Sequence, residues 1–132
     1  MTRFAFFAGA IVPIEQAKVS VMTQSLSYGT GCFEGIRAYW NADDEQLFIF
    51  RMPEHYARLH RSARLLHSQL PHTVEELGEI TVELLRREGF REDTYIRPLV
   101  YKATEGIGVR LHDLRDALTI FALPFGKHVE AE

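Results

Sequence analysis

Hydrophobic positions in the first third of the chain fall in short runs, broken by polar turns. The run over residues 4–13 is aromatic or β-branched on both sides of Gly9, which permits a turn, so we expect a hairpin of two short strands. Residues 32–40 have the composition of a strand interrupted at Gly35. After a polar turn, residues 46–51 alternate into a further strand, which we expect to pair antiparallel with the preceding one.

The pattern then changes to helical spacing. Pro53 suits the first turn of a helix, and apolar residues recur every three or four positions after it. The spacing therefore predicts an amphipathic helix over residues 53–68. Its predicted buried stripe consists of Tyr56, Leu59, Ala63 and Leu66.

A second helix is predicted over residues 74–88. Thr73 is followed three residues later by Glu76, which is the pattern of a capping box, and Gly89 suits the end of the helix. Its predicted buried stripe consists of Leu77, Ile80, Leu84 and Leu85.

Two apolar runs complete the pattern, and both are expected to be strands: residues 94–102 and residues 117–123. The first four strands have connections too short for parallel crossovers, which need about a dozen residues or more. We therefore expect an α+β fold, a two-layer sandwich of a mainly antiparallel sheet with two helices on one face.

Composition narrows the class of protein. The chain has 132 residues, 46% hydrophobic residues, 25% charged residues and a net charge of −3, which is typical of one globular domain without a nucleic-acid-binding surface. Its single cysteine, Cys32, cannot form an internal disulfide, and no signal sequence is recognisable. Apolar runs are shorter than the roughly 20 residues of a membrane helix. We expect a cytoplasmic protein with no membrane or nucleic-acid partner.

The unusual stretch is Tyr28-Gly-Thr-Gly-Cys-Phe-Glu-Gly-Ile-Arg37, in which three glycines accompany aromatic and charged residues. By itself it fits either a glycine-rich turn or a loop that lines a ligand site. Tyr95 and Arg97 are two residues apart in a predicted strand, so their side chains share a face. There Arg97 could form either an internal salt bridge or an anion-binding pair with Tyr95.

Other candidates are weaker. Arg58 lies on the first predicted helix, where an arginine is usually solvated but can also bind a phosphate or carboxylate through its planar fork. The histidines do not cluster in a pattern suited to zinc, and no metal site is expected.

Three blocks in the same order and spacing resemble the class IV aminotransferases, most closely the branched-chain amino acid aminotransferases. They are Tyr28–Tyr39, the Arg-x-x-Glu-His-x-x-Arg-Leu pattern of residues 51–59, and Tyr95-Ile-Arg-Pro-Leu99. The resemblance runs from about residue 4 to residue 126. It implies a two-domain enzyme of fold type IV, with pyridoxal 5′-phosphate bound between the domains.

The resemblance also implies roles for individual residues. Arg58 would hold the cofactor phosphate, and Phe33 would line the apolar pocket for the substrate side chain. Tyr95 and Arg97 would face the substrate, with Arg97 suited to the distal carboxylate of glutamate or 2-oxoglutarate. Tyr28 and Val109 would be contributed to a neighbouring subunit's pocket, which implies a homodimer or higher homo-oligomer.

The resemblance further divides the chain. Residues 1–126 would be the amino-terminal small domain and residues 127–132 the start of the interdomain linker. The family's Schiff-base lysine lies in the large domain, and Lys18, Lys102 and Lys127 do not match its position. We therefore expect this chain alone to be inactive, because the reaction needs that amine.

The implied activity is exchange of the amino group between leucine, isoleucine or valine and 2-oxoglutarate. Two alternatives share the fold: a D-amino acid aminotransferase and an aminodeoxychorismate lyase. A third alternative is a non-catalytic binding or oligomerisation module.

Overall fold

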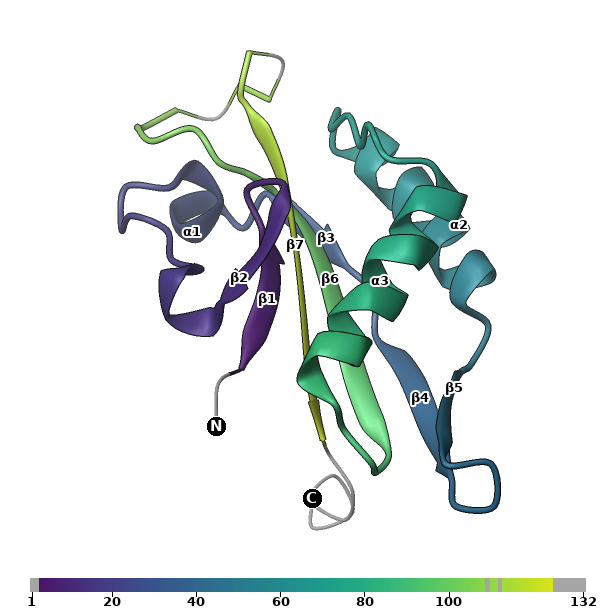
Figure 1. Ribbon diagram of the computed structural model, residues 1–132. Coiled ribbons are helices and arrows are strands. Elements are labelled where there is room, and N and C mark those ends of the chain that lie inside the picture. The colour runs from purple at the N-terminus through teal and green to yellow at the C-terminus, as the bar shows by residue number, and fades with distance from the viewer. Residues whose placement is uncertain (1–2, 109, 112, 125–132) are drawn as a thin grey trace, which may run out of the picture.

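An antiparallel sheet with two long helices on one face makes up the computed structural model, which describes residues 3–108, 110–111 and 113–124 (Figure 1). The strands are β1 (Phe4–Phe7), β2 (Ala10–Pro13), β3 (Gly31–Phe33), β4 (Ile36–Asn41), β5 (Gln46–Ile49), β6 (Thr94–Lys102) and β7 (Asp116–Pro124). The helices are α1 (Gln24–Tyr28), α2 (Met52–Leu65) and α3 (Val74–Glu88), and a 3₁₀ turn spans Ile14–Gln16. The expected α+β class and two-layer arrangement are confirmed.

The strands are arranged in the order β2-β1-β7-β6-β4-β5, with β3 paired to β6 beside this path. Each recorded strand pair is antiparallel, including the predicted hairpin β1–β2 and the pair β4–β5. The predicted interruption at Gly35 is also confirmed, because β3 ends shortly before β4 begins and both strands pair with β6. Residues 34 and 35 therefore form a short break between two strands on the same neighbour.

The predicted helix ends are confirmed for α3 and partly wrong for α2. In α3 the Thr73 side chain accepts a hydrogen bond from the Glu76 N–H while the Glu76 side chain accepts one from the Thr73 N–H, and Gly89 ends the helix in the left-handed conformation. Helix α2 ends at Leu65, three residues before the predicted end. The reason is local. The Ser68 N–H donates a hydrogen bond to the Ala63 carbonyl oxygen, and His67 adopts a left-handed backbone conformation with a φ of +55°.

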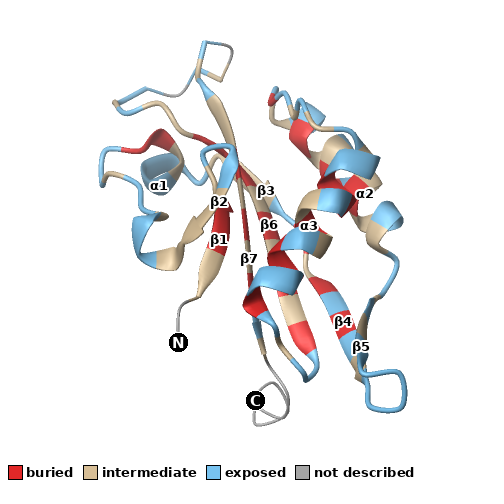
Figure 2. Ribbon diagram, viewed as in Figure 1, coloured by how far each residue is buried: buried red, intermediate tan, exposed pale blue. Residues whose placement is uncertain are grey.

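The core lies between the sheet and the two long helices, as the buried positions in Figure 2 show. Ile96 and Val100 of β6 point into it, opposite Tyr56 and Leu59 of α2. Burying a side chain of this size stabilises the fold by about 1.5–3 kcal/mol. The Tyr56 hydroxyl contacts the Thr81 hydroxyl of α3 at 2.5 Å, and burial raises the pKa of Tyr56 to about 12.

The opposite face of the sheet, here called the far face, carries the odd-numbered residues of β6, because side chains alternate along a strand. Directly paired residues share a face, so Phe33 lies on it beside Leu99, and Arg37 beside Tyr95. Several aromatic side chains there are well exposed, among them Phe33, Tyr39 and Phe48.

Helix α1 was not predicted from the sequence. It has five residues, too few for a periodic pattern, and tertiary hydrogen bonds hold it in place. The Gln24 N–H donates to the Thr104 carbonyl, and the Gln24 side-chain amide donates to the Gly108 carbonyl. In Figure 1, α1 lies across the sheet from α2 and α3, so it covers part of the far face.

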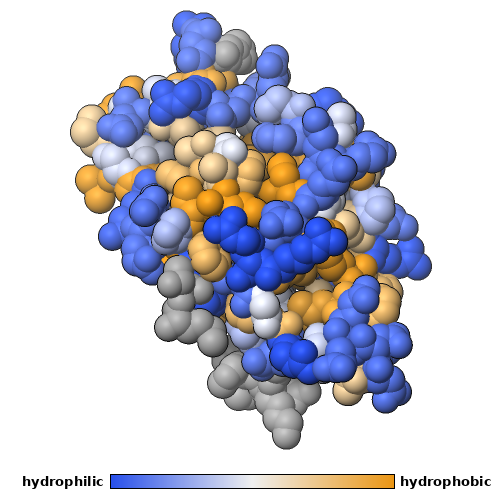
Figure 3. Space-filling view, in the orientation of Figure 1, coloured by the Kyte–Doolittle hydropathy of each residue, from blue (hydrophilic) through white to orange (hydrophobic). Residues whose placement is uncertain are grey.

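Hydrophilic side chains cover much of the surface over the two long helices, with apolar patches between them, as Figure 3 shows for one side of the molecule. Within the described part of the chain, each helix is too short or too polar to cross a membrane.

Candidate functional site

Three of the predicted site residues meet on the far face. The Arg97 guanidinium carbon lies 4.0 Å from the centroid of the Phe33 ring, and Arg97 Nη2 donates a hydrogen bond to the Tyr95 hydroxyl at 2.7 Å. Phe33 comes from β3, and the other two come from β6. The prediction that Tyr95 and Arg97 point to the same face is therefore confirmed, and the two side chains are in contact.

Gly35 makes room for this group. A Cβ atom at position 35 would lie 2.3 Å from the Tyr95 hydroxyl oxygen and 2.9 Å from the ring carbon that carries it. Atoms at such distances repel strongly, so any side chain here would displace the Tyr95 ring. The glycine thus sets the position of the phenol, which in turn accepts the Arg97 hydrogen bond.

Arg97 has an electrostatic environment suited to an anion. Among the described residues, no carboxylate lies within 4.0 Å of its guanidinium, so the structure offers no support for the alternative of an internal salt bridge. Its Nε atom is buried and has no hydrogen-bond partner within the described ranges. A buried donor of this kind is costly unless a partner binds it, and a carboxylate is the natural partner for a guanidinium.

A second cluster joins α2 to the break between β3 and β4. The Glu34 carboxylate accepts hydrogen bonds from Nε and Nη2 of Arg58, both at 2.8 Å, and contacts Nδ1 of His55 at 2.8 Å. Burial alone would raise the pKa of Glu34, but the hydrogen bonds from Arg58 and His55 hold it below its usual value. The hydrogen bonds to Glu34, together with the negative charge of Glu34, raise the pKa of Arg58.

The position of Arg58 is compatible with binding a phosphate. A guanidinium has five N–H donors, and Glu34 takes two of them on one edge. The Arg58 side chain is 60% exposed, so the donors of the other edge remain accessible to a ligand. Residues 55 and 58 lie on one side of α2, one turn apart, which brings both to the same carboxylate.

Of the remaining two predicted site residues, only Tyr28 is described, and it takes part in neither cluster. Tyr28 is the last residue of α1, and its hydroxyl accepts a hydrogen bond from the Gly108 N–H at 3.1 Å. Val109 lies outside the described residues. The structure thus places Tyr28 next to the segment that leads to position 109.

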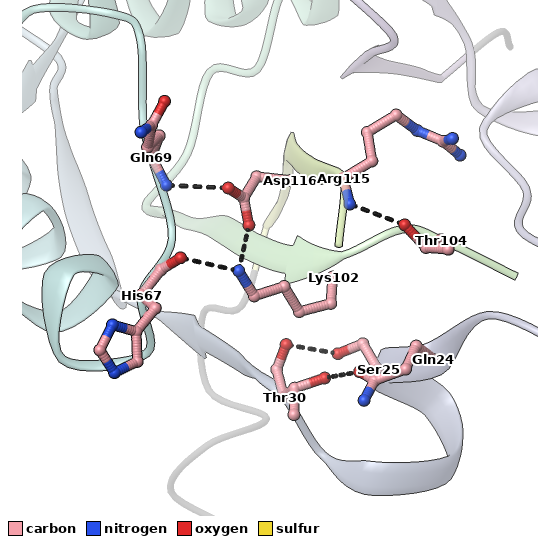
Figure 4. A network of polar contacts seen from close by, with 9 residues as sticks. All are labelled: Gln24, Ser25, Thr30, His67, Gln69, Lys102, Thr104, Arg115 and Asp116. Atoms are coloured by element: carbon pink, nitrogen blue, oxygen red, sulfur yellow. Dashed lines mark hydrogen bonds and ion pairs between the residues drawn. The ribbon is translucent and has the colours of Figure 1, made fainter. Parts of the chain in front are cut away.

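Lys102 is a buried residue in a network of polar contacts (Figure 4). Its Nζ donates to Asp116 Oδ1 at 2.7 Å and to the His67 carbonyl at 2.9 Å, while the Gln69 N–H donates to Asp116 Oδ2. This lysine is fully buried and ties the α2–α3 connection to β6 and β7. Its amine is therefore occupied in holding the fold together, and Lys127 lies outside the described residues.

Sequence reasoning did not assign a role to Glu34 or to His55. Both lie inside the matched blocks, but a sequence does not show whether a loop carboxylate or a helical histidine contacts a distant residue or faces solvent. A usable signal was the glycine beside Glu34, which marks a strand break where a side chain can turn to the other face.

Comparisons with known proteins identify the family of the chain. The family profile described as Amino-transferase class IV matches residues 31–132. A probable branched-chain-amino-acid aminotransferase of Aquifex aeolicus is 49% identical over 127 residues, which are 96% of this chain and 41% of that protein.

Solved structures are similar as well. The branched-chain aminotransferase of Thermoproteus uzoniensis with norvaline superposes with a TM-score of 0.90 at 44% identity, covering 97% of this chain and 42% of that one. The branched-chain amino acid aminotransferase of Thermobaculum terrenum in its PLP-bound holo-form gives a TM-score of 0.84 at 31% identity, covering 93% and 40%. The chain thus spans about two fifths of the length of these relatives. With its profile match and the small-domain fold of these structures, the chain belongs to the class IV aminotransferase family.

Proposed function

We propose that this chain is the small domain, over residues 1–126, of a pyridoxal-phosphate-dependent branched-chain amino acid aminotransferase. The intact enzyme would exchange the amino group between leucine, isoleucine or valine and 2-oxoglutarate. The observation that supports this most is the contact of Arg97 with Phe33 and Tyr95, which sets a cation beside apolar surface on one face of the sheet.

Such a site suits two kinds of side chain in turn. A branched aliphatic side chain would pack against the exposed Phe33 ring, and the distal carboxylate of glutamate or 2-oxoglutarate would bind the Arg97 guanidinium. Because the Arg97 Nε already lacks a partner among the described residues, binding a carboxylate would satisfy a buried donor. Tyr95 would keep the guanidinium in place for both half-reactions.

The cofactor would be held through its phosphate by Arg58. When bound, pyridoxal phosphate supplies an electron sink that makes the substrate α-proton acidic. Arg58 would use the N–H donors on its free edge for the phosphate oxygens, while Glu34 keeps the opposite edge. The lysine that moves the proton would come from the large domain, so the small domain alone would have no transaminase activity.

A neighbouring subunit would complete the pocket. Tyr28 and Val109 would be supplied to the partner's site, and the contact between Tyr28 and Gly108 supports this by joining the two segments that carry them. The active enzyme would therefore be at least a homodimer, and we propose that it is cytoplasmic.

A substrate panel tests the proposed activity. The purified protein that contains this chain should convert L-leucine, L-isoleucine and L-valine with 2-oxoglutarate, measured as glutamate formed. Activity confined to D-amino acids, or release of pyruvate from aminodeoxychorismate, would replace this proposal with one of the other reactions of the same fold.

Arg97→Met tests the site itself. The KM for 2-oxoglutarate should rise about tenfold or more, because a charge-assisted pair is lost, while the KM for the 2-oxo acid of leucine should change little. Arg61→Met, an exposed arginine on α2, is the control and should leave both values unchanged. Equal changes for the two substrates would contradict the carboxylate role of Arg97.

The non-catalytic alternative has its own test. The intact mass of the expressed protein is compared with the 15.2 kDa of this chain, and its visible spectrum is recorded with pyridoxal phosphate before and after borohydride. A mass of more than twice that value with a borohydride-sensitive band supports the enzyme. A mass of 15.2 kDa without such a band supports a binding module.

A further inference from the structure

We infer that Glu34 is a positioning residue that orients Arg58 toward the cofactor phosphate and connects the phosphate site to the substrate site. This inference rests on the proposed cofactor role of Arg58. Glu34 itself would touch neither cofactor nor substrate.

Glu34 is held firmly enough for this role. Its residue surface is 4% exposed, and its N–H donates to the Pro98 carbonyl of β6 at 3.1 Å. Its carboxylate makes the two 2.8 Å bonds to Arg58 and the 2.8 Å contact to His55 that were described above. The fork-to-fork geometry fixes the plane of the guanidinium as well as its position.

The charge of Glu34 argues that its effect is geometric. A carboxylate beside an arginine lowers the net positive potential that a phosphate would meet, so by charge alone Glu34 would weaken phosphate binding. A free arginine side chain is long and samples many rotamers, however, and each binding event must then fix them. Glu34 fixes them in advance, which leaves the outer edge of the guanidinium oriented for the ligand.

The neighbours of Glu34 extend its influence. Phe33 lies against the Arg97 guanidinium, and Gly35 makes room for the Tyr95 hydroxyl. Three consecutive residues therefore contact both halves of the proposed site, with residues 33 and 35 on the far face and residue 34 turned toward α2. A shift of Glu34 would move the wall of the substrate site too.

The test measures cofactor binding separately from activity. Dissociation constants of pyridoxamine 5′-phosphate and of pyridoxamine, which lacks the phosphate, are measured by fluorescence on the cofactor-free full-length protein. In Glu34→Gln the constant for the phosphorylated ligand should rise about tenfold, and that for pyridoxamine should stay within about twofold. An unchanged or tighter affinity for pyridoxamine 5′-phosphate would overturn the inference, because the orientation of Arg58 by Glu34 would then make no net contribution to phosphate binding.

A double-mutant cycle separates the inference from the proposal beneath it. Arg58→Ala should remove the preference for the phosphorylated ligand, and adding Glu34→Gln should then have no further effect. If Arg58→Ala leaves the preference intact, the proposed cofactor role of Arg58 fails. If Arg58→Ala removes it but Glu34→Gln does not reduce it, only the positioning role fails.

Two further variants guard against a purely structural effect. Glu54→Gln removes an exposed acid near the start of α2 and should leave both dissociation constants unchanged. If Glu34→Gln does not fold, Glu34→Asp replaces it in the test. This variant keeps the charge, but its side chain is too short to reach Arg58 and His55 together. The inference expects the same selective loss for the phosphorylated ligand, and equal losses for the two ligands would overturn it.

Discussion

Lys102 is a buried charge whose value to the fold depends on its partners. The amine is fully buried, and Asp116 with the His67 carbonyl supplies the hydrogen bonds that offset the cost of removing it from water. An intact buried ion pair contributes little to the free energy of unfolding, yet the loss of one member leaves the other as an unpaired buried charge. Single substitutions in this network are therefore informative.

Lys102→Met should lower the free energy of unfolding by about 3 kcal/mol, because the Asp116 carboxylate, whose side chain is 17% exposed, loses its cation. Urea unfolding of the expressed protein measures this change. Glu45→Gln breaks the exposed pair with Arg91 and should cost less than about 1 kcal/mol. Equal losses in the two variants would show that the buried network has no special role.

Asp116 should also shape the pH dependence of stability. Burial would raise the pKa of Asp116, but hydrogen bonds from the Gln69 N–H and from Lys102 outweigh it and hold the pKa below its usual value of 3.8. As the pH falls below about 4, the unfolded state therefore binds more protons than the folded state. The contribution of Asp116 to stability is lost as the pH falls through its lowered pKa in the folded state.

Asp116→Asn should accordingly make the acid side of the stability profile shallower, when the free energy of unfolding is followed from about pH 6 to about pH 3. Glu34, whose pKa is also lowered, should leave part of the slope in place. Asp43→Asn, at an exposed turn position, is the matched control and should reproduce the original profile. If the acid side of the stability profile is as steep in Asp116→Asn as in the original protein, Asp116 does not contribute to it.

Gly35→Ala should impair the substrate site. The added methyl group would displace the Tyr95 hydroxyl and with it the Arg97 hydrogen bond, so the KM for 2-oxoglutarate should rise several-fold. Steady-state kinetics with varied 2-oxoglutarate measures this. Gly78→Ala in α3 meets only the flexible end of Met52 at 3.1 Å and should leave kinetics unchanged. A normal KM in Gly35→Ala would mean that Tyr95 can move without consequence.

At the scale of elements, α2 and α3 begin in different ways. Helix α3 starts with a complete capping box, whereas the residue before α2, Arg51, adopts the left-handed conformation and provides no side-chain cap. Packing of Tyr56 and Leu59 against the sheet, together with Pro53 in the first turn, compensates for the missing cap in α2.

Thr73→Ala should lower the free energy of unfolding by about 1 kcal/mol, because the Glu76 N–H loses its acceptor at the start of α3. Thermal or urea unfolding measures the change. Glu79→Ala, on the exposed side of the same helix, should be close to neutral. A Thr73→Ala protein as stable as the original would imply that water replaces the cap at no cost.

At the scale of the whole molecule, the sequence predicted what periodicity and local caps determine. The strands, both long helices and the shared face of Tyr95 and Arg97 follow from residue type and spacing, and Thr73 and Gly89 located the ends of α3. Helix α1 could not be predicted, because its hydrogen bonds run to residues about 80 positions away. The hydrogen bonds from Arg58 of α2 to Glu34 could not be predicted for the same reason, since they join residues 24 positions apart that the fold brings together.

The placement of β1 between β2 and β7 has a consequence for biosynthesis. Thr119 of β7 donates its hydroxyl hydrogen bond to the Phe6 carbonyl of β1 across 113 residues of sequence. At roughly 5–20 residues per second of synthesis, the nascent first hairpin waits on the order of ten seconds for that neighbour. During this interval the Phe-Ala-Phe-Phe strand lacks one of its two neighbours, so its unpaired backbone groups and apolar side chains are exposed to aggregation until β7 has been made.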